Sequence, residues 1–242
     1  TIGYSGPDDR APSTRRLAGG CDGCRCAFLG AGTVKERVIH SDACVAEGAD
    51  WLCRADPRFA NAMEGLPPLP LRLKPDGFAE LLSAIVSQQV SVASANAIWG
   101  RLQAGGMTTP SVVAQASEAE LRALGLSRQK ARYAQALAAA QIDYDTLPLL
   151  PAQEVIAQLT AVPGIGAWTA EIYAMFSLGR ADVFAPGDLA LQEAAKLIFD
   201  LPARPKEKDL RAMADAWSPW RSVAARIMWA YYKHHKQREG IR

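Results

Sequence analysis

The chain is 242 residues long, has a formal net charge of +2 and is 49% hydrophobic. That length suffices to bury the core of one large or two small domains, and this share of apolar residues excludes a wholly disordered chain. No apolar run reaches the roughly 18–20 residues that span a bilayer, and no secretory signal opens the sequence. We therefore expect a globular protein that is not secreted and has no membrane partner.

Residues 1–34 differ in composition from the rest of the chain. They hold seven of the 19 glycines and show no apolar periodicity, so we expect a disordered or artefactual extension there. Cys21, Cys24 and Cys26 hint at a zinc site. Without a second cluster at the usual spacing, reduced thiols are the better interpretation.

Helical spacing and capping residues predict a series of helices after residue 40. The expected ranges are 41–55, one long run over 76–102, then 118–124, 128–140, 152–159, 167–178, 189–199, 206–217 and 222–233. A proline-rich connection occupies 66–75. No segment shows the alternation of a strand, so the expected fold class is all-α.

Two amides interrupt the apolar pattern of the run over 76–102. Gln88 and Gln89 follow Ile85 and Val86 directly after one serine. Amides inside an apolar helix need hydrogen-bond partners or a ligand. A solvent-facing turn of helix explains the pair equally well, and the residues alone leave both interpretations open.

The stretch over 159–191 organises the chain. A tight turn, Val162-Pro163-Gly164-Ile165-Gly166, separates two apolar helices, and its glycines permit unusual backbone angles and close approach of another backbone. The N–H groups that open the second helix lack intrahelical partners, so they can bind a phosphate oxygen. An ordinary helix-to-helix turn would have the same local sequence.

A single carboxylate follows this turn at a fixed distance. Asp188 stands 22 residues after Gly166 and directly after Ala185-Pro186-Gly187. An Asp in this position is either a helix cap or a functional carboxylate. The tryptophans near the end of the chain, Trp217 and Trp220, are expected in the core.

Together these residues resemble the helix-hairpin-helix, Gly-Pro-Asp superfamily of DNA glycosylases, and within it DNA-3-methyladenine glycosylase II. The resemblance is strongest over 162–170 and 182–188 and extends from about His40 to Tyr232. It implies a two-lobed helical fold with the active site in the cleft between the lobes. One lobe would cover about 76–184, and the other about 35–75 plus 185–242. The β-rich N-terminal domain of some relatives would be lacking.

The resemblance also implies roles for individual residues. The segment over 85–93 would lie by the pocket for a flipped base, with the residue after Gln88 filling the gap in the duplex. The roles are catalysis for Asp188; base binding for Gln88, Gln89, Trp168, Ile172 and Trp229; phosphate binding for Gly164, Ile165, Gly166, Ala167 and Thr169; and a monovalent cation, sodium or potassium, on the carbonyls of Thr160, Val162 and Ile165.

The chemistry follows from this assignment. Breaking an N-glycosidic bond builds positive charge on the sugar, which a carboxylate such as Asp188 stabilises. Relatives that also cut the strand carry a lysine amine where this chain has Trp168, so we expect hydrolysis alone, without lyase activity. No cysteine follows Cys53, so the iron–sulfur cluster of some relatives is not expected, nor is any other cofactor beyond the cation.

The expected substrate is duplex DNA carrying alkylated purines such as 3-methyladenine or 7-methylguanine. Relatives often have a further aromatic residue at Ile172, and the adjacent Tyr173 would point about a hundred degrees away, which leaves the base preference open. Deaminated bases, hypoxanthine or uracil, are the alternative substrates. A non-catalytic DNA-binding protein is the alternative of another class. We expect a monomer in the cytoplasm, with the nucleoid, or in the nucleus.

The charge distribution agrees with a DNA partner. Residues 201–242 contain ten Lys or Arg and four acids, a local charge of +6, which suits a surface facing phosphates. Its last ten residues, 233–242, are better explained as a solvated tail.

Overall fold

The computed structural model describes residues 36–238, so the expectations for residues 1–34 and for the three N-terminal cysteines lie outside it. The described part is helical, with one isolated antiparallel bridge between Val38 and Arg180, and the all-α prediction is confirmed. The helices are α1 (Asp42–Ala55), α2 (Pro57–Met63), α3 (Phe78–Ser87), α4 (Val92–Ala104), α5 (Pro110–Gln115), α6 (Glu118–Ala123), α7 (Arg128–Ala139), α8 (Ala152–Thr160), α9 (Ala167–Phe176), α10 (Leu189–Ile198), α11 (Glu207–Ala214) and α12 (Arg221–Arg238), with 3-10 turns η1 (Leu147–Leu149) and η2 (Asp215–Trp217). None of them is both long and apolar enough to cross a membrane.

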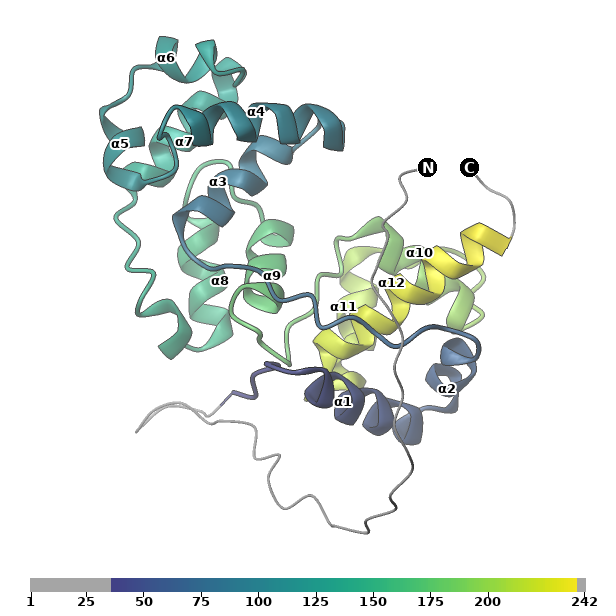
Figure 1. The fold of residues 1–242 in the computed structure, drawn as a ribbon. Coiled ribbons are helices and arrows are strands. Elements are labelled where there is room, and N and C mark those ends of the chain that lie inside the picture. Colours follow the sequence, from purple (N-terminus) through teal and green to yellow (C-terminus); the bar gives the residue numbers. More distant parts are fainter. Residues whose placement is uncertain (1–35, 239–242) are drawn as a thin grey trace, which may run out of the picture.

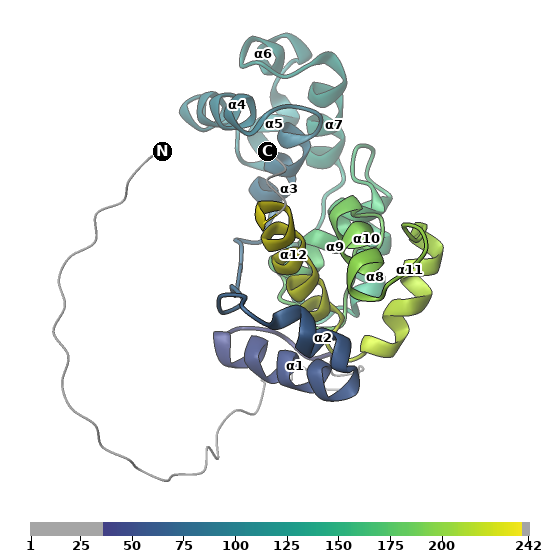
Figure 2. The same cartoon turned by 90° about the vertical axis from the view of Figure 1, so that its right-hand side faces the viewer.

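The helices form two lobes (Figure 1). One lobe holds α3 to α7 with α8, around buried residues such as Leu82, Leu102 and Leu121. The other holds α1, α2 and α10 to α12, around residues such as Leu52 and Phe59. The view turned by 90° shows α4 to α7 at one end and α1 and α2 at the other (Figure 2).

Helix α9 joins the two lobes, because it contributes side chains to both cores. Ala170 and Tyr173 pack into the lobe of α3, whereas Met175 and Phe176 pack into the lobe of α12. The proline-rich connection crosses between the lobes a second time, where Lys74 N donates to the carbonyl of Phe176 at 2.9 Å. A helix held from both sides is a fixed platform for whatever lies at its N-terminus.

The single helix expected over 76–102 is wrong. Helix α3 ends at Ser87 and α4 begins at Val92, because Gln89 has φ +54° and cannot continue a right-handed helix. Ser91 then starts α4 afresh by accepting a hydrogen bond from Ser94 N at 3.2 Å. The sequence reasoning also missed two short helices, α2 and α5, each of which starts with a proline in its first turn.

Tight packing between α1 and α12 closes the C-terminal lobe. A Cβ atom on Gly48 would lie 2.6 Å from Cε3 of Trp220 and 2.7 Å from Cγ2 of Val223. Trp220 and Trp217 are 2% and 4% exposed, so both are core residues, as expected. The contact leaves no room for a side chain on α1 at this point.

We therefore expect Gly48→Ala to lower the free energy of unfolding by about 1–3 kcal/mol through overpacking against Trp220. Gly100→Ala is the matched control, because Gly100 lies in α4 with no atom within 4 Å of its Cβ position. It should stabilise the protein by about 0.5–1 kcal/mol, since alanine is the better helix former. Urea unfolding followed by circular dichroism measures both. Equal effects in the two variants would contradict the packing argument.

Candidate active site

The Asp188 carboxylate is fixed by N–H donors from three helices. As the N-cap of α10, its Oδ1 accepts hydrogen bonds from Ala190 N at 2.9 Å and Leu191 N at 3.1 Å. The Nε1 atoms of two tryptophans complete the set: that of Trp229 lies 3.2 Å from Oδ1 and that of Trp168 3.1 Å from Oδ2. The sequence left open whether Asp188 is a cap or a functional carboxylate, and the geometry allows it to be both.

The two indoles that hold Asp188 differ in exposure. Trp168, in the first turn of α9, is 46% exposed, which is high for a tryptophan in a structured region. Trp229 comes from α12 and is half-buried, with its ring 5.8 Å from that of Phe176. Trp168 therefore presents a free aromatic surface beside the carboxylate, whereas Trp229 braces the carboxylate from within.

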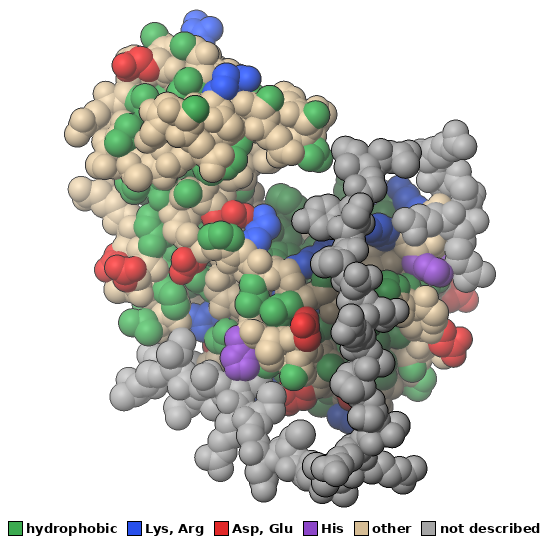
Figure 3. Space-filling view, viewed as in Figure 1, with side chains coloured by type: hydrophobic (Ala, Val, Ile, Leu, Met, Phe, Trp, Pro, Cys, Tyr) green, Lys and Arg blue, Asp and Glu red, His purple; other side chains and the backbone are tan. Residues whose placement is uncertain are grey.

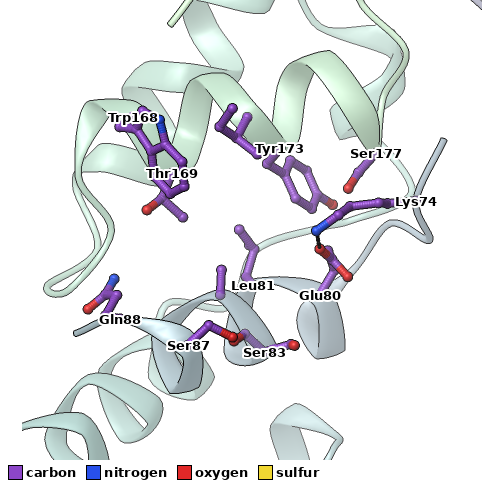
Figure 4. Close-up of a pocket in the computed structure, with 12 residues that line it drawn as sticks. Lys74, Glu80, Leu81, Ser83, Ser87, Gln88, Trp168, Thr169, Tyr173 and Ser177 are labelled. Atoms are coloured by element: carbon purple, nitrogen blue, oxygen red, sulfur yellow. Dashed lines mark hydrogen bonds and ion pairs between the residues drawn. The ribbon is translucent and has the colours of Figure 1, made fainter. Parts of the chain in front are cut away.

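A cavity of about 200 Å³ opens between α3 and α9 beside Trp168. In Figure 4 the side chains of α9 face those of α3 across it, with Trp168 and Gln88 at one end. Lys74 and Glu80 form an ion pair of 2.6 Å at the other end. The cavity therefore has the Trp168 indole at the end that is linked to Asp188 and an ion pair at the other end. Its size suits one small flat ring system rather than a larger ligand.

The site lies where the lobes meet. The cavity is built by α3 and α9, whereas Asp188 and Trp229 belong to α10 and α12. The space-filling view shows the surface hollowed between the upper lobe and the lower one (Figure 3). This position agrees with the expected cleft.

The turn between α8 and α9 presents open N–H groups beside this site. Gly164 has φ +94°, and the ring of Tyr133 fills the space of a side chain, 2.4 Å from the Cβ position. Gly166 is different: its φ is −87° and no atom lies within 4 Å of its Cβ position. Gly166 also caps α9 without a side-chain bond, so the first N–H groups of α9 are available to an anion.

Comparisons with known proteins agree with this geometry. The family model of the HhH-GPD superfamily base excision DNA repair proteins matches residues 82–221. The chain belongs to this superfamily. DNA-3-methyladenine glycosylase 1 of Schizosaccharomyces pombe is 30% identical over 165 residues, which are 64% of this chain and 72% of the relative.

Solved structures of the superfamily share the fold. A DNA-3-methyladenine glycosidase from Bacillus halodurans has a TM-score of 0.71 and 32% identity, over 84% of this chain and 95% of that one. The Schizosaccharomyces pombe 3-methyladenine DNA glycosylase in complex with abasic DNA has a TM-score of 0.63 and 26% identity, over 78% of this chain and 97% of that one.

The structure places most of the residues expected from the superfamily around one site. Gln88, Trp168, Thr169 and Ile172 line the cavity. Trp229 does not line the cavity but donates a hydrogen bond to Asp188. The side chain of Thr169 is 7% exposed and faces the cavity, so any phosphate contact would come from its backbone.

Gln89 does not line the cavity but stands exposed on the turn after α3.

Tyr173, Lys74 and Glu80 are among the cavity residues that the sequence analysis did not assign to the site. Tyr173 was expected to point away from Ile172, but both line the cavity, whose wall spans more than one face of α9. Its hydroxyl accepts a hydrogen bond from Gly77 N at 2.8 Å, and burial raises the pKa of Tyr173 to about 12, so it is a neutral phenol at physiological pH. Lys74 and Glu80 carried no signal in the sequence, because only folding brings the proline-rich connection beside α3.

The opposite side of α9 carries a second charged group. Glu171 is 3% exposed and pairs with Arg211 of α11 at 2.8 Å. Burial raises the pKa of this carboxyl, and Arg211 opposes the shift. The pair ties α9 to the C-terminal lobe on the side away from the cavity, and so helps to hold Trp168 against Asp188.

The carbonyls expected to hold a cation lie at the end of α8 and in the turn that follows it. Thr160 is the last residue of α8, where carbonyls lack intrahelical donors, and the Val162 carbonyl accepts a hydrogen bond from Ile165 N at 3.1 Å. Neutral oxygens of this kind suit a hard cation of low charge. Within residues 36–238 no cluster of His, Cys, Asp or Glu could hold a metal ion.

The two hairpin glycines should fail for different reasons. Gly164→Ala forces a side chain into Tyr133 at a positive φ, so we expect the free energy of unfolding to fall by more than about 1 kcal/mol. At Gly166 no protein atom lies within 4 Å of the Cβ position, so we expect Gly166→Val to change stability by less than about 1 kcal/mol. Its DNA affinity should nevertheless drop, alike for damaged and undamaged duplexes. Denaturant unfolding and fluorescence anisotropy separate the two effects. A loss confined to damaged DNA would contradict a phosphate role for Gly166.

Proposed function

We propose that this chain is a DNA glycosylase that flips alkylated purines, such as 3-methyladenine and 7-methylguanine, out of duplex DNA and hydrolyses their N-glycosidic bond. This reaction begins base excision repair. One observation carries the proposal: the Asp188 carboxylate is held by two indole N–H groups, one of them from Trp168, which lines a base-sized cavity beside a hairpin with open N–H groups. The names of the relatives, which are 3-methyladenine glycosylases, support it.

The parts of the site divide the reaction among them. The N-terminus of α9 binds a backbone phosphate, which positions the duplex without reading its sequence. A base extruded from the stack enters the cavity and meets the exposed face of Trp168. An alkylated purine carries positive charge, which an electron-rich indole face attracts. Normal bases lack that charge, so the interaction favours the lesion.

Asp188 acts on the sugar. As the glycosidic bond breaks, the sugar becomes positively charged, and a carboxylate fixed in advance stabilises that charge without reorganising. Four N–H donors hold the carboxylate in place, so its orientation does not depend on the substrate. The base leaves with the electrons of the broken bond, and a water molecule oriented by Asp188 attacks the sugar carbon and gives up a proton to the carboxylate.

The same geometry supports hydrolysis without strand cleavage. A Schiff base requires an unprotonated amine at the sugar, but the residue that opens the hairpin helix beside Asp188 is Trp168. Lys74 does line the cavity, yet it lies at the end away from Trp168 (Figure 4) and pairs with Glu80 at 2.6 Å. An ammonium in an ion pair is not a nucleophile.

Other features of the proposal concern its setting. We assign one monovalent cation to the carbonyls of Thr160, Val162 and Ile165, where it would neutralise part of the phosphate charge. Damaged duplex DNA would be the partner of a monomeric protein. Its place would be with the DNA, in the cytoplasm or the nucleus.

The decisive experiment is release of bases from methylated duplex DNA, with the products identified by chromatography. We expect 3-methyladenine and 7-methylguanine in the free fraction. Asp188→Asn should lower the rate by at least ~100-fold while DNA binding persists, because asparagine caps a helix as well as aspartate does. Release of hypoxanthine or uracil alone would indicate a glycosylase for deaminated bases. Binding without any release would indicate a non-catalytic DNA-binding protein.

A second experiment tests the absence of lyase activity. Borohydride reduces a Schiff base to a stable bond, so it traps an enzyme that attacks the sugar with an amine. We expect no covalent adduct on methylated DNA and a product strand that stays intact until alkali cleaves it. A trapped adduct in the wild-type protein that disappears in Lys74→Met would show that the cavity lysine is a nucleophile and that the hydrolytic assignment is wrong.

A further inference from the structure

The turn between α3 and α4 is an exposed tip beside the mouth of the cavity. We call residues 88–91 the tip turn. Gln88 lines the cavity, Gln89 is exposed at φ +54°, and Val90 is 38% exposed. Val92, the first residue of α4, is 77% exposed. A side chain exposed on a turn next to a base-binding cavity, here Gln89 with apolar neighbours, can enter the stack when a base leaves it.

A single lysine from another helix holds the tip turn. Lys130 of α7 donates from Nζ to the carbonyl of Val86 at 2.7 Å and to that of Gln88 at 2.5 Å. These carbonyls lie at the C-terminal end of α3, where they lack intrahelical donors and carry the negative end of the helix dipole. Both partners are neutral oxygens, so the lysine fixes the backbone of the turn rather than neutralising a carboxylate.

The same helix also supports the hairpin. Tyr133, one turn after Lys130 on α7, fills the space over Gly164 with its ring. The tip turn also contacts the hairpin directly, because Nε2 of Gln88 donates to the carbonyl of Gly164 at 2.9 Å. Helix α7 therefore contacts both segments that face the DNA, and these two segments also contact each other.

We infer that Lys130 is a positioning residue, which holds the tip turn in register with the hairpin so that gripping the phosphate and filling the gap left by the base occur together. This inference rests on the proposed function, because it assumes that a base leaves the duplex at this site. Lys130 does not touch the substrate. Its effect on DNA passes through the backbone of residues 86–88.

The role predicts a specific defect when the lysine is removed. Lys130→Met should weaken binding to a duplex with a tetrahydrofuran abasic analogue by about tenfold, the usual effect of losing a partly buried charge-assisted hydrogen bond. Binding to undamaged duplex should change by less than twofold. A 2-aminopurine next to the analogue should report less unstacking. Arg128→Met is the matched control, since it removes a positive charge two residues away whose ion pair is with Glu118.

A double-mutant cycle separates positioning from general stabilisation of the lobe. Gln89→Gly removes the side chain at the tip while its φ stays accessible. If Lys130 acts through the tip turn, adding Lys130→Met to Gln89→Gly should cost less than twofold more in affinity for the abasic analogue. Lys130→Gln, which keeps two N–H donors without the charge, should lose less affinity than Lys130→Met and serves if Lys130→Met does not fold.

Three outcomes would overturn the inference: equal losses in Lys130→Met and Arg128→Met, a loss that is as large for undamaged duplex, or losses that multiply in the double variant. Affinity for the abasic analogue requires no turnover. If the wild-type protein binds the analogue and releases no methylated base, the proposed function fails while the positioning test still has a result.

Discussion

The site depends on one interaction, the fixing of the Asp188 carboxylate by N–H groups that come from α9, α10 and α12. A partly exposed carboxylate would otherwise sample several rotamers in water and stabilise a transition state poorly. Here the cost of orienting it is met when the protein folds, which is the condition for electrostatic catalysis. The fold brings N–H donors from these three helices to within 3.2 Å of the oxygen atoms of one carboxylate.

Helix α9 connects this interaction to the rest of the molecule. Its first turn carries Trp168 and the open N–H groups of the hairpin, and its last turn is buried in the other lobe. Glu171 ties its far side to α11, and Tyr173 ties its near side to Gly77. A displacement of α9 would therefore disturb the open N–H groups of the hairpin, the exposed Trp168 ring and the Asp188 carboxylate together.

The small net charge of the protein bears on how it would bind DNA, because undamaged and damaged duplexes attract it to the same extent at long range. A net charge of only +2 gives weak attraction to any duplex. In the proposed function, the specific contacts would instead be made by neutral groups, the hairpin amides and the indole of Trp168. Discrimination would then come from the positive charge of an alkylated base against the indole face and not from long-range attraction.

The sequence determined the helical class, the hairpin turn and the positions of Asp188 and Trp168, because these depend on local spacing: glycines in a turn, a cap before a helix, apolar residues at helical intervals. It could not show that the run over 76–102 breaks at Gln89, since glutamine is compatible with a helix. The break is stabilised by contacts with Lys130 and Gly164, which lie 41 and 75 residues after Gln89 in the sequence. Nor could it place Tyr173, Lys74 and Glu80 in one cavity, because their proximity depends on how α3, α9 and the connection between the lobes pack. Turns, caps and helical spacing depend on neighbouring residues, so the sequence shows them. The hydrogen-bond partners of a buried carbonyl or carboxylate come from distant segments, so only the tertiary structure determines them.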